Sequence, residues 1–208
     1  YIPENKWAWE SLIAARTFNL VTALPKLGKS ALTAGFISSW KYGVGEFLGH
    51  KINGDCPPVI IAGTDQPLCD WQGILHPAGL MKQTKKDHYE VIEPIVKLWH
   101  RGDPIHLDEA GIELIEREAE KHPNALIVGD AFSTLISPLG LNENLEECVE
   151  PIHNLLERIE PYGATLVLIH HSSRGNADKR ASEASRGTGA LPAAASQLIQ
   201  LEHFSKNK

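Results

Sequence analysis

Five short apolar runs constrain the fold of this chain more than any other feature. Most of their residues are apolar in succession instead of alternating with polar ones, which is typical of strands covered on both faces. Longer segments with helical spacing separate them. This order predicts an α/β fold with a mainly parallel, twisted sheet flanked by helices. The runs are Phe18–Ala23, Pro58–Gly63, Ala125–Asp130, Ala164–His170 and Ser196–Leu201.

Five segments between these runs are predicted to be helical. Leu145–Ile159 has the clearest pattern, with apolar residues at i, i+3 and i+4 on one face and glutamates elsewhere, which we interpret as a solvated surface. Asp108–Lys121 begins with acidic residues, where the helix dipole favours them. The other three are Ser30–Tyr42, a segment through Trp71, and Tyr89–His100.

The length of the chain sets the expected number of domains. Its 208 residues are enough to bury a substantial core, and we expect residues 1–208 to form a single domain with a lead-in segment at 1–17. Residues 172–189 contain no large apolar side chain, so they predict a mobile loop.

Composition indicates a cytoplasmic protein without a membrane partner. The cysteines Cys56, Cys69 and Cys148 are odd in number and lack metal-ligand spacing, which favours a reducing compartment. No window has the apolar length of a membrane span, and the first residues lack a secretory pattern. The formal net charge of -6 does not suggest a protein that coats DNA, although a basic channel can lie inside an acidic shell.

A Gly-Lys-Ser string joins the first predicted strand to the helix after it. The string Ala23-Leu-Pro-Lys-Leu-Gly28-Lys29-Ser30 follows the pattern G-x-x-x-x-G-K-[ST] except that alanine stands first. In such a loop, backbone N–H groups point at a phosphate, Lys29 reaches the β- and γ-phosphates, and Ser30 offers its hydroxyl to Mg²⁺. The alternative is a chance glycine turn. We expect nucleotide contacts from Ala23, Leu24, Pro25, Lys26, Leu27, Gly28, Lys29, Ser30 and Ala31.

Two aspartates follow predicted strands. Asp130 ends the run ALIVGD, and Asp65 follows the run VIIAG. The carboxyl ends of parallel strands form the edge where ligands bind in open α/β sheets. Asp130 is therefore a candidate metal ligand beside Ser30, and Asp65 is a candidate for polarising the attacking water. The alternatives are an Asp130 that only caps a turn and an Asp65 that only precedes Pro67 in a turn.

Together these residues resemble the RecA/DnaB superfamily of hexameric motor ATPases, and most of all the RepA-type replicative helicases. The resemblance extends from LVTALPKLGKSALT to SRGTGALPAAASQLIQL and rests on five motifs in the family's order. The family usually has glycine at position 23 and glutamate at position 65, so the shorter aspartate predicts slow hydrolysis. The motifs are Gly28-Lys29-Ser30, Asp65, Asp130, His170-His171 and Arg186-Gly187-Thr188-Gly189-Ala190-Leu191.

The resemblance implies a RecA-like P-loop ATPase domain that uses ATP and Mg²⁺, forms a hexameric ring and acts on single-stranded DNA in replication or mobile-element maintenance. His171, which is nearer the following loop than His170, would sense the γ-phosphate. Arg186 would reach the nucleotide site of the neighbouring subunit. The alternatives are a hydrogen-bonded histidine pair at a strand end and an arginine that binds DNA or solvent. The implied catalytic residues are Lys29, Asp65, Asp130, His171 and Arg186.

Cations outnumber acids in residues 172–189. This balance indicates contact with a nucleic-acid backbone, and the lack of aromatic side chains argues against sequence reading. A solvated loop is the alternative. The cations are Arg174, Lys179, Arg180 and Arg186, and the acids are Asp178 and Glu183.

Two other functions stay open for the whole chain. One is a nucleotide-dependent regulatory or assembly ATPase without unwinding, as in KaiC-like members of the superfamily. The other is a degenerate P-loop domain.

Overall fold

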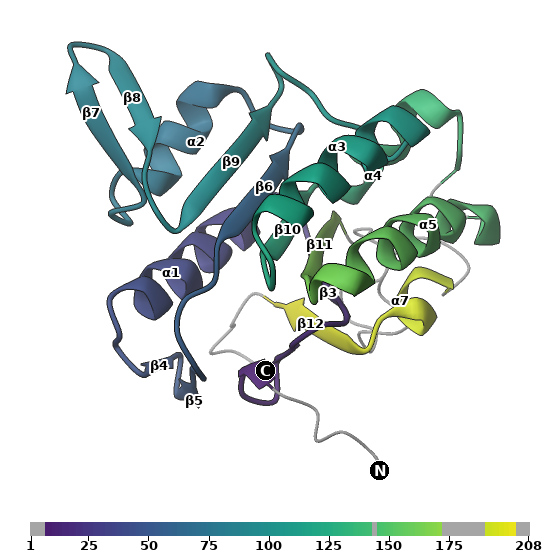
Figure 1. The fold of residues 1–208 in the computed structure, drawn as a ribbon, viewed down its shortest axis with the longest axis horizontal. Helices are drawn as coiled ribbons and strands as arrows, with labels where there is room; N and C mark the ends of the chain where they lie inside the picture. The colour runs from purple at the N-terminus through teal and green to yellow at the C-terminus, as the bar shows by residue number, and fades with distance from the viewer. Residues whose placement is uncertain (1–6, 143–144, 172–189, 203–208) are drawn as a thin grey trace, which may run out of the picture.

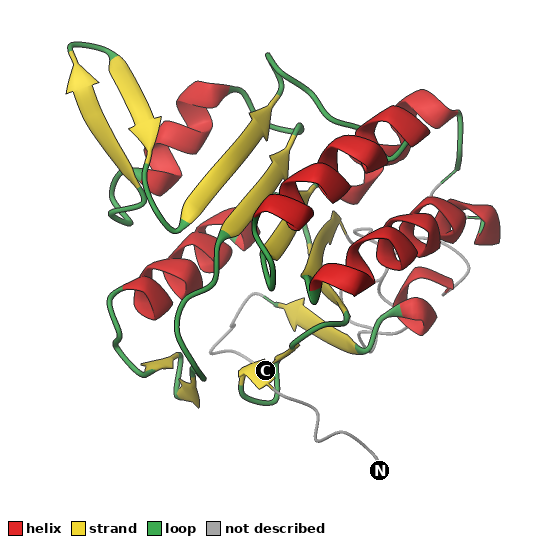
Figure 2. Ribbon diagram, in the orientation of Figure 1, coloured by secondary structure: helices red, strands yellow, loops and turns green. Residues whose placement is uncertain are grey.

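Six strands form one parallel sheet at the centre of the molecule. The computed structural model describes residues 7–142, 145–171 and 190–202. The strand order is β12-β3-β11-β10-β6-β9, and each neighbouring pair is parallel. Figures 1 and 2 show the sheet between two layers of helices, which confirms the predicted α/β fold. The strands are β3 (Phe18–Ala23), β6 (Val59–Gly63), β9 (Ile95–His100), β10 (Leu126–Asp130), β11 (Thr165–His171) and β12 (Gln197–Leu201).

Each face of the sheet packs against its own helices. Phe36 and Trp71, from α1 (Lys29–Lys41) and α2 (Leu68–Leu75), share one core cluster with Val21. The other cluster joins Leu20 to apolar residues of the remaining helices. These helices are α3 (Glu109–Lys121), α4 (Phe132–Ile136), α5 (Glu150–Ile159) and α7 (Ala190–Ala194), with the short 3₁₀ turns η1 (Ser137–Leu139), η2 (Glu146–Val149) and η3 (Glu160–Tyr162).

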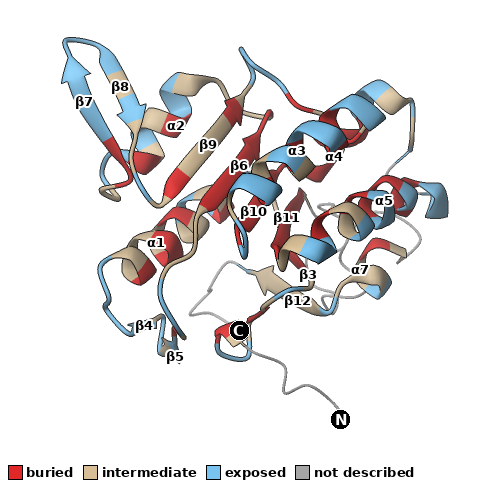
Figure 3. Ribbon diagram, in the orientation of Figure 1, coloured by how far each residue is buried: buried red, intermediate tan, exposed pale blue. Residues whose placement is uncertain are grey.

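The central strands are buried on both faces, as their continuous apolar runs predict. Every residue of β3, β6 and β10 is buried, and β11 is buried except at its last residue (Figure 3). The edge strand β12 is only half-buried along its length. The chain therefore places its most apolar runs in the middle of the sheet, where both faces are covered.

The predicted helix at Tyr89–His100 is wrong. This segment contains the end of β8 (His88–Val91) and the edge strand β9, and β7 (Met81–Lys85) pairs antiparallel with β8. The β7–β8 hairpin projects from the body beside α2 (Figure 1). Pro94 explains the error, because proline lacks an N–H donor and disfavours helical conformation in the residue before it. The surrounding β-branched residues also favour strands.

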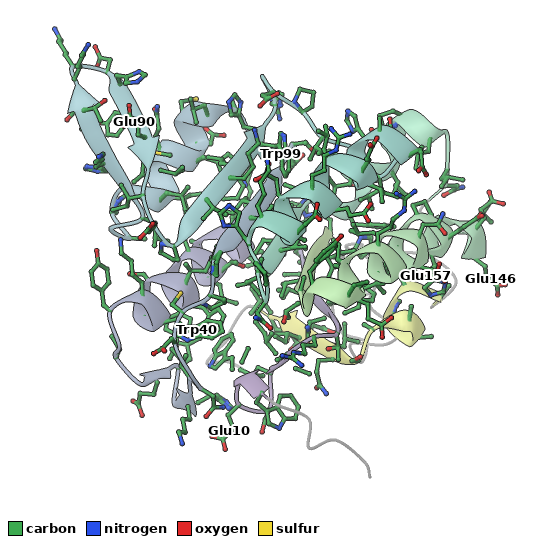
Figure 4. All side chains as sticks on the ribbon, in the orientation of Figure 1. Glu10, Trp40, Glu90, Trp99, Glu146 and Glu157 are labelled. Atoms are coloured by element: carbon green, nitrogen blue, oxygen red, sulfur yellow. The ribbon has the colours of Figure 1, made fainter. Side chains whose placement is uncertain are left out.

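The predicted helix at Leu145–Ile159 is divided. The turn η2 comes first, and α5 begins at Glu150 with Pro151 in its first turn, where the missing N–H is tolerated. Leu145, expected on the apolar face, is 45% exposed because it precedes both elements. Glu146 and Glu157 are exposed and point away from the body in Figure 4, in agreement with a solvated acidic surface.

The described part of the N-terminal lead-in packs into the domain. It forms β1 (Trp7–Trp9) and β2 (Ile13–Ala14), and Trp9 stacks on Phe36 at 4.9 Å between ring centroids. A second small sheet, β4 (Glu46–Phe47) with β5 (His50–Lys51), follows α1. The predicted loop at 172–189 lies outside the described residues. Within the described part of the chain, no helix combines the length and apolar character needed to cross a membrane.

Candidate nucleotide-binding site

The candidate residues meet at the carboxyl edge of the sheet because of strand register. Ala23 at the end of β3 pairs with His171 at the end of β11, and Asp130 ends β10 opposite Ile169. β6 pairs with β10 and ends at Gly63, so Asp65 follows at the same edge. Four strands therefore bring together residues that are far apart in the sequence, as expected for a ligand site in an open α/β sheet.

The loop from Leu24 to Gly28 leads directly into α1. Gly28 is the N-cap of the helix with a φ of 82°, a left-handed conformation that glycine adopts without strain. A Cβ added at Gly28 would meet no atom within 4 Å, so there is free space beside the backbone at this point of the loop. The first N–H groups of α1, which have no intrahelical partners, can donate to a phosphate there.

Alanine fits where the family pattern has its first glycine. Ala23 is a buried residue of β3, paired with His171 on one side and Leu201 on the other, and its φ is not positive. The strand geometry therefore does not need the freedom of glycine at this position. Alanine at position 23, where the pattern has glycine, is therefore compatible with the conformation of the loop.

Lys29 is buried at the start of α1 and directs its ammonium into the loop. Nζ donates to the carbonyl oxygens of Ala23 at 3.1 Å and Leu24 at 3.0 Å, and lies 3.0 Å from Nδ1 of His171. Burial lowers the pKa of Lys29 from its ordinary value, and the carboxylates of Asp130 and Asp65 oppose that shift. The hydrogen bonds described for the Lys29 ammonium therefore go to two carbonyl oxygens and one imidazole nitrogen.

Ser30 and Asp130 place a hydroxyl and a carboxylate side by side at the candidate site. The Ser30 hydroxyl donates to Oδ2 of Asp130 at 2.5 Å, and Asp130 is only 2% exposed. Burial raises the pKa of Asp130, and the bond from Ser30 opposes the shift. A hydroxyl and a carboxylate side by side suit a hard divalent cation such as Mg²⁺. The two residues therefore fit the predicted metal site.

Asp65 lies beside His171 in the turn after β6. Its N–H donates to the carbonyl oxygen of Asp130 at 3.3 Å, and its Oδ2 is 3.8 Å from Nε2 of His171. Interaction with His171 is the main cause that lowers the pKa of Asp65, although 3.8 Å is longer than a direct hydrogen bond, and partial burial opposes the shift. The Asp65 carboxylate is therefore favoured in its ionised form, as a base requires.

Two residues of this edge are absent from the sequence prediction. Gln66 donates from Nε2 to Ser30 Oγ at 2.9 Å and approaches Asp130 Oδ2 at 3.4 Å. Arg101 donates from Nη2 to the carbonyl oxygen of Asp65. Gln66 has a sequence signal, since it directly follows a candidate residue. Arg101 has none, because it follows β9, which the sequence pattern assigned to a helix.

The two adjacent histidines point to opposite faces of the sheet. His171 faces the loop and Lys29, whereas His170 is fully buried against Phe132, with ring centroids 6.0 Å apart. Only His171 is therefore placed at the candidate site. Arg186 lies outside the described residues.

Two cavities lie away from this edge. Their volumes are about 460 and 670 Å³, and both are lined by Trp40, Gly54 and Asp55. They lie near the amino ends of the strands, since Leu126 and Pro58 are among their lining residues. Neither includes Lys29, Asp65, Asp130 or His171, so neither cavity is part of the candidate site.

Comparison with known proteins supports the class of fold and family. A family model described as an AAA domain matches residues 1–177. A search of curated proteins found no match to the chain. Among solved structures, a KaiC-like protein from the hyperthermophilic archaeon Pyrococcus horikoshii OT3 is similar with a TM-score of 0.59 and 17% identity. The alignment covers 96% of this chain and 77% of that one.

Proposed function

We propose that this chain, which belongs to the AAA domain family and has a RecA-like P-loop ATPase fold, binds ATP with Mg²⁺ and hydrolyses the bond between the β- and γ-phosphates. One observation carries this proposal. Lys29, Asp130, Asp65 and His171 come from four separate segments and meet at one edge of the sheet, next to an open loop. Each has the chemistry that phosphoryl transfer to water needs.

The loop and Lys29 would hold the phosphates. The Lys29 ammonium now donates to neutral carbonyl oxygens, and a phosphate oxygen is a stronger, charged acceptor. Gly28 adds no side chain beside the first turn of α1, and the space that its Cβ would occupy is free of other atoms. The transferred group would therefore lie between the start of α1 and the ends of β10 and β11.

Ser30 and Asp130 would hold the metal ion. When bound, Mg²⁺ would supply positive charge that offsets the negative charge of the phosphate oxygens. The 2.5 Å bond between these two residues fixes the hydroxyl and the carboxylate at a common point. Gln66 donates to the same two oxygens, so its amide must turn or shift when a cation takes its place.

Asp65 would accept a proton from the attacking water. Its carboxylate is partly exposed and kept ionised by its neighbours, which suits a base that must meet both solvent and substrate. His171 contacts Lys29 on one side and lies near Asp65 on the other, so it would report the state of the γ-phosphate to residues 172–189, which follow it. These roles agree with four of the five sequence motifs.

The finer proposal is a ring-forming, helicase-like motor on single-stranded DNA. Its support is the RepA-type order of motifs in the sequence, with the cations of residues 172–189 contacting the nucleic-acid backbone and Arg186 completing the site of a neighbouring subunit. A second candidate, a slow nucleotide-dependent assembly or regulatory ATPase, is favoured by Asp65, whose side chain is one methylene shorter than the family's glutamate.

One experiment tests the proposal and separates the two candidates. ATP turnover is measured with Mg²⁺ or with EDTA, with and without single-stranded DNA, while native mass spectrometry follows the oligomer in Mg-ATP. Mg²⁺-dependent turnover supports the ATPase, and stimulation by DNA supports the motor. A ring with slow turnover that DNA does not change supports the regulatory candidate. Absence of both nucleotide binding and turnover contradicts the proposal.

A further inference from the structure

We propose that Arg101 is a positioning residue for ATP hydrolysis, which holds the turn that carries Asp65. The inference rests on the proposed function, because it concerns the carboxylate assigned to water activation. Arg101 belongs to none of the five sequence motifs, and its side chain is exposed. The role of Arg101 is therefore inferred from its hydrogen bonds in the structure and not from a sequence motif.

Strand register brings Arg101 to the site. The edge strand β9 pairs in parallel with β6, and His100 at the end of β9 lies opposite Gly63 at the end of β6. Both strands thus end at the same level, so the residues that follow them are neighbours. These residues are Arg101 on one side and the turn with Asp65 and Gln66 on the other.

Two hydrogen bonds join Arg101 to the turn. Its guanidinium donates from Nη2 to the carbonyl oxygen of Asp65, and its backbone N–H donates to the carbonyl oxygen of Gln66 at 2.9 Å. The first bond is charge-assisted and is the stronger kind. Because only the first bond uses the side chain, a substitution can remove it and leave the second in place.

The backbone at Arg101 is fixed independently of the guanidinium. His100 and Asp103 exchange two backbone hydrogen bonds, at 3.1 and 2.8 Å, and the N–H of Gly102 donates to Nδ1 of His100 at 3.0 Å. These bonds form a tight turn directly after β9. The backbone of Arg101 is therefore held by the hydrogen bonds of this turn. Loss of the Arg101 side chain should not disturb β9.

The inner side of the Asp65 turn contacts the metal ligands. The N–H of Asp65 donates to the carbonyl oxygen of Asp130, and the amide of Gln66 donates to Ser30 Oγ. Arg101 thus contacts the turn on the side of β9, while Ser30 and Asp130 contact it on the side of α1 and β10. A shift of the turn would move the Asp65 carboxylate and also break the contact between Gln66 and Ser30.

The short side chain of Asp65 makes this support important. An aspartate has one fewer rotatable bond than the family's glutamate, so its carboxylate follows its backbone closely. A displacement of about 1 Å at a reacting group can slow a reaction by roughly 100-fold. Interactions of exposed charged side chains typically contribute about 1 kcal/mol or less to global stability. The contacts of Arg101 are therefore better explained by local positioning than by support of the fold.

The test compares Arg101→Ala and Arg101→Lys with the parent chain. Turnover is measured at saturating Mg-ATP, affinity with a non-hydrolysable ATP analogue, and backbone order by amide hydrogen exchange of residues 64–66 without nucleotide. In Arg101→Ala, turnover should fall about 10- to 100-fold at near-parent affinity, and the Asp65 amide should exchange faster. Arg101→Lys should recover part of both, because an ammonium can still donate to the Asp65 carbonyl oxygen.

The matched control is Arg117→Ala. Arg117 is an exposed arginine of α3 that pairs with Glu113 at 2.5 Å, and within the described residues none of its contacts reaches the site. It should leave both turnover and exchange unchanged. Parent-like turnover, or parent-like exchange, in Arg101→Ala overturns the inference. A parent chain with neither nucleotide binding nor turnover would overturn the proposed function, whereas faster exchange in Arg101→Ala would still support the hold of Arg101 on the turn.

Discussion

The ammonium of Lys29 lies 3.0 Å from Nδ1 of His171, although 142 positions separate the two residues in the chain. A lysine ammonium can only donate, so Nδ1 must accept, and a neutral His171 carries its proton on Nε2. That nitrogen is 3.8 Å from Oδ2 of Asp65. The cation assigned to the phosphates and the carboxylate assigned to water therefore lie on two sides of one imidazole ring.

Lys29→Met should abolish turnover and weaken ATP binding without unfolding the domain. A hydrogen bond to a charged group contributes about 1.5–3 kcal/mol, which corresponds to roughly 10- to 100-fold in affinity. The burial that lowers the Lys29 pKa disfavours its charge in the folded protein, so methionine should not lower the melting temperature. Titration with a fluorescent ATP analogue and a thermal melt measure the two effects. Lys121→Met, on the exposed end of α3, is the control, and parent-like turnover in Lys29→Met would remove Lys29 from the site.

Asp130→Asn should stabilise the metal-free protein while it removes the effect of Mg²⁺. Burial raises the pKa of Asp130, so the folded protein binds this proton more tightly than the unfolded chain does. Stability then falls as the pH rises above the ordinary value of 3.8, and the loss is complete above the folded-state pKa. Asparagine carries no charge and can still accept from Ser30.

The measurement for Asp130→Asn is a pair of thermal melts at pH 8, with EDTA and with Mg-ADP. We expect the variant to gain about 1 kcal/mol in EDTA and to lose most of the stabilisation that Mg-ADP gives the parent. Glu120→Gln, at an exposed position of α3, should resemble the parent in both buffers. A variant that is less stable in EDTA and equally stabilised by Mg-ADP would contradict the assigned role.

The sequence predicts the elements that carry the site, because their signals are local. The run at Phe18–Ala23 has the same bounds as β3, and the Gly-Lys-Ser string forms the N-cap and the first two residues of α1. Asp130 and Asp65 could be placed at the sheet edge since both follow buried apolar runs. A strand, a loop and a helix start are each decided within a few residues.

The parts that the sequence does not predict depend on contacts between distant segments. A short apolar segment such as Ile95–His100 fits either a strand or a helix, and its pairing with β6 decides the outcome. The link between Arg101 and Asp65 follows from that register, so it could not be predicted once the segment was assigned to a helix. The β7 strand is mostly polar and exposed, so no apolar pattern indicates it.

Gly63→Ala should destabilise the domain, whereas Gly73→Ala should not. A Cβ at Gly63 would lie 2.3 Å from the ring of Trp71, which is buried and donates to the Gly63 carbonyl oxygen at 3.0 Å. Overpacking of this kind costs about 1–3 kcal/mol. At Gly73, inside α2, a Cβ meets no atom within 4 Å, and alanine should add roughly 0.5–1 kcal/mol through helix propensity. Urea unfolding followed by tryptophan fluorescence measures both, and equal midpoints for the two variants would contradict the packing described for Trp71.

Asp65→Asn should slow hydrolysis and leave ATP binding near the parent value. The variant keeps the backbone contacts of the turn to Asp130 and Arg101 but loses the proposed base. General-base catalysis contributes about 10²- to 10⁴-fold, so a fall of at least 100-fold in turnover is expected. Single-turnover measurements separate the chemical step from binding. Asp70→Asn, in the first turn of α2, is the control.

Asp65→Glu should hydrolyse ATP at least as fast as the parent. The Asp65 side chain is 36% exposed, so the edge has room for one more methylene group. Glutamate would also restore the length that RepA-type ATPases use at this position. If Arg101 holds the turn, the longer side chain should depend less on its support, since an extra rotatable bond lets the carboxylate adjust. Removal of the Arg101 side chain should therefore slow Asp65→Glu less than it slows the parent, as a double-mutant cycle of single-turnover rates would show. Equal losses in both backgrounds would mean that Arg101 and Asp65 act independently.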